Sequence, residues 1–292
     1  MSIKKISLKV LFLVGVAAFI FQGFTSCKTA PKEKVIGLQL YSVRDDMKKD
    51  VPGTIAAVGK MGYKFVETAG YKDGKIYGMD PVEFKNLCEK NGLDVWGAHA
   101  GQAVPTEENW DKTMAWWDVC IAAYKSVGAK WIVQPSMNKV GYESLDGLKS
   151  YCKYFNAVGE KCNAAGMRFG YHNHSHEFTT ILDGKPVYDW MLELTDAKKV
   201  MFEMDLYWII EGGKKPCDYF EKYPGRFELF HIKDAEEVGA SGKIDFAAIF
   251  AQRKKAGAKY GIVEVERYNF TPLESCKKSI DFLEAADYVD LY

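Results

Sequence analysis

The sequence predicts an α/β protein of the (β/α)8 TIM barrel class, with a single barrel domain at residues 35–292 after an N-terminal export segment. Three observations support this. Apolar, β-rich runs alternate with longer segments of helical periodicity, and the alternation repeats eight times. The alternation covers about 255 residues, which is a typical length for eight such units in a closed barrel. No Gly-x-Gly-x-x-Gly turn follows the first run, where a dinucleotide-binding sheet would carry one.

Eight short runs rich in β-branched, aromatic and other apolar residues are the expected barrel strands. This composition suits parallel strands that are buried on both faces. The runs cover residues 35–41, 65–69, 94–99, 131–135, 168–172, 200–206, 227–232 and 260–266.

A segment with apolar residues at helical spacing follows each run. Trp110, Trp116 and Trp117 fall in the third segment and are expected to pack the helix against the barrel. Six segments are followed by a glycine, which suits the left-handed residue after a helix. The helices are centred on residues 54–61, 81–90, 109–127, 145–165, 187–194, 217–223, 246–256 and 273–286, and the glycines are Gly62, Gly92, Gly128, Gly166, Gly225 and Gly257.

The first 26 residues differ from the rest of the chain. They contain three lysines, no acidic residue and an apolar run of 12 residues at 10–21. A bilayer-spanning helix needs roughly 20 apolar residues, so this run predicts a secretory signal peptide at 1–26. Phe24-Thr25-Ser26-Cys27 resembles a bacterial lipobox. We therefore expect lipidation of Cys27, a polar tether over 27–34 and a membrane-anchored lipoprotein on the periplasmic side, with simple secretion as the alternative.

The other six cysteines show no Cys-x-x-Cys spacing, and most of them fall among apolar neighbours in predicted helices. A chain of this length buries a large core without disulfides. We expect buried free thiols and no zinc–cysteine site.

Charge argues against a nucleic-acid partner. The chain has 39 basic and 39 acidic side chains, and without the three lysines of the signal peptide 36 basic groups face 39 acidic ones. Nucleic-acid affinity comes mainly from clustered lysine and arginine, which a weakly acidic body does not supply. Membrane contact is expected only through the lipid anchor, and the oligomeric state stays open.

All five histidines fall at or just after a predicted strand end. His99 ends the third run, His172, His174 and His176 leave the fifth, and His231 lies late in the seventh. Active sites of (β/α)8 barrels are built at the C-terminal ends of several strands. The histidines therefore indicate an active site at that end, with His176 expected to be a loop residue.

Carboxylates also occur inside predicted strands, where a solvated charge is not expected. Because side chains alternate along a strand, Glu203 shares a face with Asp205, and Glu264 shares one with Glu266. The second run carries Glu67. Carboxylates and imidazoles that converge on one barrel mouth form a mixed nitrogen and oxygen site for one divalent cation, with Mn²⁺, Co²⁺, Zn²⁺ and Mg²⁺ all open.

Five short segments are distinctive in combination. They are Ile36-Gly37-Leu38-Gln39-Leu40-Tyr41-Ser42, Gly170-Tyr171-His172-Asn173-His174, Met204-Asp205-Leu206-Tyr207-Trp208, His231-Ile232-Lys233-Asp234 and Ile262-Val263-Glu264. Together they resemble the sugar phosphate isomerase/epimerase family, the xylose isomerase-like barrels, over nearly the whole chain after the tether. In the ketose epimerases of that family, Glu, Asp, His and Glu from strands five to eight hold a divalent metal. The resemblance implies that Asp205, His231 and Glu264 are ligands, with His172 at the first position.

Two positions depart from the ketose epimerase pattern. His172 replaces the first glutamate ligand, and Trp208 replaces a histidine that lies three residues after the aspartate. Those epimerases use their first and last carboxylates as a pair of proton-transfer bases, so a two-carboxylate mechanism is not expected here. His174 lies on the same face as His172 and is the alternative ligand at that position.

The remaining candidates are assigned to proton transfer or to substrate contact. Glu266 is also the alternative to Glu264 as a ligand, and Glu67 is alternatively a hydrogen-bond partner of a sugar hydroxyl. We expect proton transfer by Glu264, His174 and Glu67, charge neutralisation by Lys233, and substrate contacts from His99, Trp208 and Glu266.

A divalent cation that chelates a carbonyl and its neighbouring hydroxyl stabilises the enediolate that forms when a base removes the adjacent proton. The first hypothesis is therefore a metal-dependent isomerase or epimerase of an unphosphorylated sugar or keto-sugar, since no phosphate-binding glycine-rich loop is evident. One alternative is a lyase or dehydratase of a keto-sugar such as a 3-keto-glycoside. Another is a non-catalytic carbohydrate-binding lipoprotein. A related abasic-site endonuclease would need a multi-zinc cluster and a basic face, and is disfavoured.

Overall fold

The computed structural model describes residues 33–291. The predicted signal peptide at 1–26 and the predicted lipidation residue Cys27 lie outside the described residues. Over residues 33–291, no helix combines the length and the apolar character needed to cross a bilayer.

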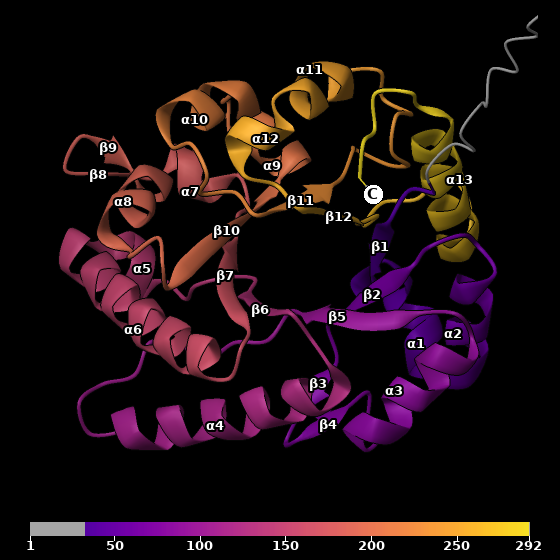
Figure 1. The fold of residues 1–292 in the computed structure, drawn as a ribbon. Coiled ribbons are helices and arrows are strands. Elements are labelled where there is room, and N and C mark those ends of the chain that lie inside the picture. Colours follow the sequence, from indigo (N-terminus) through magenta and orange to yellow (C-terminus); the bar gives the residue numbers. More distant parts are fainter. Residues whose placement is uncertain (1–32, 292) are drawn as a thin grey trace, which may run out of the picture. The chain divides into compact units, whose positions relative to one another are not determined.

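Eight parallel strands form the predicted (β/α)8 barrel, with the helices arranged around the outside of the strands (Figure 1). The fold class predicted from the alternation of apolar and helical segments is therefore confirmed. The strands are β1 (Ile36–Gln39), β2 (Phe65–Thr68), β5 (Asp94–Ala98), β6 (Trp131–Gln134), β7 (Arg168–His172), β10 (Val200–Asp205), β11 (Leu229–Ile232) and β12 (Tyr260–Val263).

The strands follow one another in the hydrogen-bonded order β5-β2-β1-β12-β11-β10-β7-β6. The ring closes between β5 and β6. There the Lys130 N–H donates to the Trp96 carbonyl at 2.7 Å and the Ala100 N–H donates to the Val133 carbonyl at 3.0 Å. Because all eight strands are parallel, their C-terminal ends meet at one mouth of the barrel.

The helices and the two small hairpins complete the fold. The long helices α4 and α6 flank the strands on one side, and α13 lies beside β1 on the other (Figure 1). The helices are η1 (Leu40–Val43), α1 (Arg44–Lys49), α2 (Val51–Gly59), α3 (Pro81–Lys90), α4 (Trp110–Val127), α5 (Val140–Glu143), α6 (Leu145–Ala164), α7 (His176–Thr179), α8 (Val187–Leu194), α9 (Leu206–Glu211), α10 (Pro216–Lys222), α11 (Phe246–Ala251), α12 (Arg253–Ala256) and α13 (Pro272–Ala285). The hairpin strands are β3 (Tyr71–Lys72), β4 (Lys75–Ile76), β8 (Ile181–Leu182) and β9 (Lys185–Pro186).

Local side chains determine where several helices begin and end. Asp50 accepts from the Gly53 N–H at the start of α2, and Ser144 accepts from the Gly147 N–H at the start of α6. At the other end, Gly128 closes α4 with φ 85°, a conformation that costs glycine little. All six glycines predicted to follow helices have positive φ.

Several predicted boundaries need correction. The segment 246–256 divides into α11 and α12 at Gln252, and the last strand stops at Val263 and not at 266. Both neighbours of β12 end at that level, because β1 passes into η1 after Gln39 and β11 ends at Ile232, so no partner strand remains. His176, expected in a loop, opens the short helix α7.

Apolar packing fills the space between the barrel and its helices, and also the lower half of the barrel interior. Trp117 is fully buried and meets Phe169 of β7 edge to face at 5.5 Å, as predicted for a packing tryptophan. The interior group consists of Phe65, Trp131, Val133, Met201, Leu229 and Ile262. Polar side chains of the same strands lie above it, toward the C-terminal mouth.

The cysteines among residues 33–291 are free thiols, as predicted. Five of them are buried and Cys217 is half-buried.

Candidate active site

Four side chains from consecutive strand ends meet at the mouth of the barrel. His172 ends β7, Asp205 ends β10, His231 lies in β11, and Glu264 follows β12. Each presents one ligand atom, and these atoms all lie within 4.8 Å of one another. The structure thus brings together the four residues expected to bind a metal.

Asp205 uses its two carboxylate oxygens for different purposes. Oδ1 caps α9 by accepting from the Tyr207 N–H at 3.0 Å and the Trp208 N–H at 2.7 Å. Asn173 braces the same backbone, because its Oδ1 accepts from the Asp205 N–H at 3.1 Å. Oδ2 is buried and has no hydrogen-bond partner among residues 33–291. The capping contacts therefore hold Oδ2 toward the cluster.

Three pairs of donor atoms in this cluster lie close to the spacing of ligands around one ion. Oδ2 of Asp205 lies 3.9 Å from both Nε2 of His172 and Nδ1 of His231, and that Nδ1 lies 3.5 Å from Oε2 of Glu264. Four ligands in tetrahedral contact at about 2.1 Å from an ion are about 3.4 Å apart.

The cluster also leaves buried polar atoms uncompensated. Within the described part of the chain, Nδ1 of His231 is a second buried atom with no hydrogen-bond partner. Burial raises the pKa of Asp205 to about 7, against the lowering effect of Lys233. An unpaired buried polar atom costs about 1–3 kcal/mol, which coordination of a cation removes. The residues present therefore fit a divalent cation.

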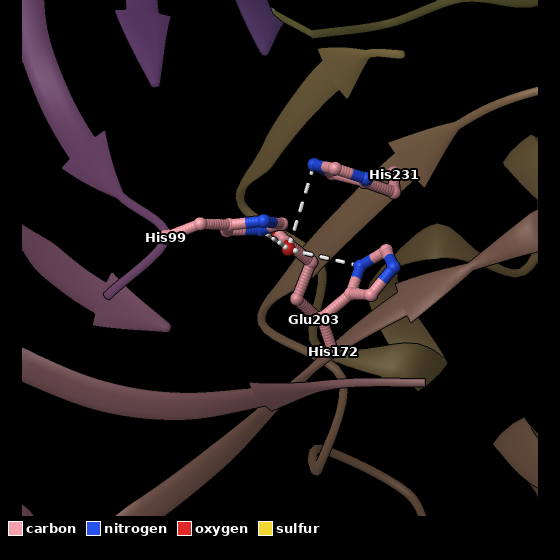
Figure 2. A group of neighbouring side chains, drawn as sticks. All are labelled: His99, His172, Glu203 and His231. Atoms are coloured by element: carbon pink, nitrogen blue, oxygen red, sulfur yellow. Dashed lines mark hydrogen bonds and ion pairs between the residues drawn. The ribbon is translucent and has the colours of Figure 1, made fainter. Parts of the chain in front are cut away.

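A second layer of carboxylates lies beneath the histidines. Figure 2 shows the rings of His99, His172 and His231 around one oxygen of Glu203. Oε2 of Glu203 is 3.2 Å from Nδ1 of His172, and Oε2 of Glu67 is 3.1 Å from Nε2 of His231. Such carboxylate contacts orient a ligand imidazole and increase its basicity. In both histidines the other ring nitrogen faces the cluster.

The structure places His99 between the two carboxylates of this layer. Its Nε2 lies 2.7 Å from Glu203 and 3.1 Å from Glu67. Burial lowers the pKa of His99, but the two carboxylates outweigh it and raise this pKa to about 10. His99 is therefore an imidazolium that holds two carboxylates close together.

His172 has the opposite electrostatic environment. Burial, reinforced by His231 and the other imidazoles nearby, holds its pKa well below the usual range. A neutral ring with a free lone pair is the form of histidine that binds a metal.

Lys233 joins the two acidic residues that follow β12. Its Nζ is 3.0 Å from Oε2 of Glu264 and 2.7 Å from Oε2 of Glu266. Burial acts to raise the pKa of Glu264, but Lys233 and His231 outweigh it and hold this pKa well below the usual range. Burial lowers the pKa of His231, but Glu203 and Glu264 outweigh it and raise this pKa well above the usual range. Three cationic side chains, His99, His231 and Lys233, therefore face the four buried carboxylates of Glu67, Glu203, Asp205 and Glu264.

A cavity of about 320 Å³ opens above the cluster. Two of the predicted ligands reach it, and His174 beside them is a free imidazole, because its buried Nδ1 has no hydrogen-bond partner in the described chain. The cavity is lined by Tyr41, Ala69, His99, Pro135, Ser136, His172, His174, Glu264 and Glu266.

The predicted site residues separate into two groups by their position relative to this cavity. His99, His174 and Glu266 line it, as a contact with substrate requires. Glu67 lies below the histidines, fully buried, with Trp131 and Gln39 donating to its carboxylate.

Lys233 and Trp208 are likewise not among the lining residues of the cavity. The Lys233 ammonium lies 5.0 Å from the Trp208 ring, and the Trp208 ring lies 5.8 Å from the His174 ring. Their contacts suit positioning of neighbouring side chains better than contact with substrate, and the same is true of Glu67.

Several residues with clear roles in the site were not assigned one from the sequence. For Glu203 the sequence predicted only that its side chain lies on the same strand face as that of Asp205. Its position inside a buried strand was the signal that could have indicated a role in the site. Asn173, which braces Asp205, had no signal beyond its place between two histidines. Glu177 was also missed: its carboxylate accepts from the His174 N–H at 2.8 Å and from the Tyr171 hydroxyl at 2.6 Å, which fixes the loop after β7.

The chain as a whole has relatives among known proteins. The family model described as xylose isomerase-like TIM barrel matches residues 55–286. An inosose dehydratase from Lacticaseibacillus casei is 23% identical over 259 residues, covering 74% of this chain and 86% of that protein.

Two solved structures extend the comparison. A sugar phosphate isomerase/epimerase from Parabacteroides distasonis shares 34% identity and a TM-score of 0.82, covering 88% of this chain and 100% of that one. The 3-keto-D-glucoside 4-epimerase from E. coli shares the fold at 19% identity, with a TM-score of 0.66 and coverage of 87% and 100%. The alternation of strands and helices and these matches agree, and the chain belongs to the xylose isomerase-like TIM barrel family.

Proposed function

We propose that the protein is a divalent-metal-dependent isomerase or epimerase of an unphosphorylated sugar or keto-sugar, acting through an enediolate. The observation that carries this proposal is the cluster of four ligand atoms beneath a cavity. Two of them, Oδ2 of Asp205 and Nδ1 of His231, are buried and lack a hydrogen-bond partner within residues 33–291. A divalent ion held there supplies a Lewis acid that polarises a carbonyl and stabilises negative charge on the oxygens beside it.

The lining of the cavity supports an unphosphorylated substrate. It contains no lysine and no arginine, and it includes the carboxylates of Glu264 and Glu266. A phosphate group binds through charge-assisted hydrogen bonds from cationic or backbone N–H donors. Sugar hydroxyls, by contrast, can donate to the two carboxylates.

His174 is the best-placed group to move a proton. It lines the cavity, and burial lowers its pKa, so the ring is neutral and can accept a proton at neutral pH. Its backbone N–H is held by Glu177, which fixes the loop on which the ring is mounted. Glu264 is less suited as a base because Lys233 stabilises its ionised form. Lys233 and Glu67 hold other side chains in place.

The second candidate is a lyase or dehydratase of a keto-sugar such as a 3-keto-glycoside. The relative from Lacticaseibacillus casei is an inosose dehydratase, and His172 stands where ketose epimerases have a glutamate. One neutral base suffices to remove a proton next to a carbonyl, and expulsion of a β leaving group then needs no second carboxylate on the opposite face. A non-catalytic carbohydrate-binding protein is the third candidate, and it would need no metal.

Metal analysis combined with mass detection of products tests the proposal. The wild-type protein should contain one divalent ion per chain, and Asp205→Asn should lose it, whereas Asp218→Asn on the exposed face of α10 should keep it. The metal-loaded protein is then given aldoses, ketoses and 3-keto-glucosides.

The products distinguish the candidates. An isomerase or epimerase conserves the mass of its substrate, whereas elimination releases water or the aglycone. Turnover should stop with a chelator and return when metal is added. Sugar binding that is unaffected by the chelator, with no turnover in the whole panel, would instead support the non-catalytic candidate.

A further inference from the structure

A second hollow adjoins the cavity above the metal cluster. It has a volume of about 340 Å³ and shares Pro135 and Ser136, in the loop that follows β6, with that cavity. Its wall comes from this loop, from the loop after β5 and from α6. The lining residues are Gly101, Gln102, Ala103, Gln134, Pro135, Ser136, Met137, Asn138 and Tyr151.

The side chains that line this hollow are uncharged, and several of them can form hydrogen bonds. Its lining contains no lysine, arginine, histidine or carboxylate, and it contains three side-chain amides and two hydroxyls. A site without charge favours a neutral ligand over a phosphate or a carboxylate, because a buried ion needs a partner of opposite charge. Amides and hydroxyls that both donate and accept are suited to a polyhydroxylated ligand.

Gln134, at the end of β6, carries a buried amide oxygen without a partner among the described residues. The residue is 3% exposed, and its Nε2 donates to the Gln102 carbonyl at 3.0 Å and to the Ser136 carbonyl at 2.9 Å. These bonds fix the amide, yet its Oε1 is buried without a hydrogen-bond partner in the chain from 33 to 291. The Tyr151 hydroxyl accepts from the Asn138 N–H at 2.9 Å, which ties the loop after β6 to α6.

We infer that this hollow is a subsite for a second sugar ring, so that the substrate is a disaccharide and not a free monosaccharide. The inference rests on the proposed function, since it takes the metal cavity as the place of the reacting ring. The two spaces have nearly equal volumes, about 320 and 340 Å³, so a hollow next to a cavity for one ring has room for another. In the elimination candidate the second ring would be the leaving group, and in an isomerase it would be a spectator that adds binding energy.

A third hollow that also adjoins the cavity does not suit a sugar as well. It shares Tyr41 and Ala69 with the cavity and has a volume of about 520 Å³. Its remaining wall is mostly apolar and aromatic, with Met47 and Tyr77 among its members, and it carries the cations Arg44 and Lys48 but no amide. An aromatic aglycone would fit there, and the experiment separates that case.

Equilibrium binding tests the subsite without relying on turnover. Calorimetry of the metal-loaded protein compares methyl glucosides with glucose disaccharides of each linkage and anomer, and with phenyl glucosides. At least one disaccharide should bind about 10-fold more tightly than the methyl glucoside of the same anomer. Ala103→Trp, which fills the hollow from its exposed rim, should remove that gain and leave methyl glucoside binding unchanged.

Two further variants complete the design. Ala122→Trp places the same side chain on the exposed face of α4 and should keep the gain. Gln102→Ala removes one side-chain amide of the wall and adds no bulky group. It should reduce the affinity advantage of the disaccharide over the methyl glucoside about fivefold, and it tests the subsite even if Ala103→Trp does not fold.

The subsite is refuted if no disaccharide exceeds its methyl glucoside, if Ala103→Trp leaves the gain intact, or if only phenyl glucosides gain affinity. These outcomes concern binding beyond the first ring. The proposed function would fail separately, by turnover without metal or by the absence of any turnover.

Discussion

Replacement of Glu203 by glutamine tests whether the carboxylate layer under the histidines supports the metal cluster. Glu203 is fully buried, and its Oε2 contacts Nε2 of His99 at 2.7 Å and Nδ1 of His172 at 3.2 Å. The change Glu203→Gln keeps the shape and removes the charge. His172 then loses the carboxylate that directs its Nε2 toward the cluster, and no ligand atom is altered.

The structure sets the size of the expected effect. Loss of a carboxylate behind a ligand histidine lowers metal affinity by about 10–100-fold, or about 1.4–2.7 kcal/mol. Of the two histidines that we propose as ligands, only His172 depends mainly on Glu203. The other, His231, is closer to Glu67, at 3.1 Å, than to Glu203, at 3.5 Å. We therefore expect a loss near the lower end of that range, about 10-fold.

Competition with a chromophoric chelator for Zn²⁺ measures this effect at neutral pH. Glu228→Gln is the matched control, because Glu228 precedes β11 at the opposite end of the barrel and contacts Arg168 and Lys259. Thermal unfolding of the metal-free proteins checks that both variants fold. An affinity of Glu203→Gln within twofold of wild type, with the control also unchanged, would refute the role of this layer.

Three other changes test the fold, its electrostatics and the N-terminal segment. The folded-state pKa of Glu228 is lowered, because Lys259 and Arg168 outweigh burial. Its stabilisation is therefore complete above its unfolded pKa and is lost as pH falls through the folded value. Urea titrations should accordingly show Glu228→Gln less stable than wild type by about 1 kcal/mol at pH 7, with little difference near pH 3. Phe155→Ala should cost about 3–5 kcal/mol in the same assay, because the ring is fully buried against Phe169 and Tyr171; a loss below 1 kcal/mol would contradict this packing. Cys27→Ala should abolish incorporation of labelled palmitate and release the protein from the membrane fraction, and retention of the label would contradict lipidation of Cys27.

The fold could be predicted in detail where its signals are local. The helix predicted at 187–194 has those bounds in the structure, and Gly128 ends α4 as expected. Predictions failed where an element depends on its neighbours in space. The last strand was expected to continue to 266, but it stops at Val263 because β1 and β11 both end there. The segment 246–256 has continuous helical periodicity, and periodicity did not reveal the break at Gln252.

The composition of the candidate site could also be predicted, but the geometry of its members could not. Asp205 and Glu203 were expected on one face because side chains alternate along a strand, and both are buried at the centre of the barrel. Whether a charged side chain reaches substrate or supports another residue was beyond the sequence. Lys233 was expected to meet developing charge, yet its ammonium lies between Glu264 and Glu266.

Periodicity, caps and charged residues inside apolar runs are properties of a few consecutive residues. From them follow the barrel and the end at which its histidines and carboxylates gather, whereas the family resemblance implied which of these side chains are ligands. The hydrogen-bonding partners at the centre of the barrel cannot be obtained in this way. Glu67 and His231 are 164 positions apart, and Glu203 and His99 are 104 positions apart. Their contacts arise from strand register and ring closure, which bring distant residues to the same height in the barrel. The height of each side chain in the barrel therefore decides its role. It separates the proposed metal ligands from the carboxylates that lie beneath them.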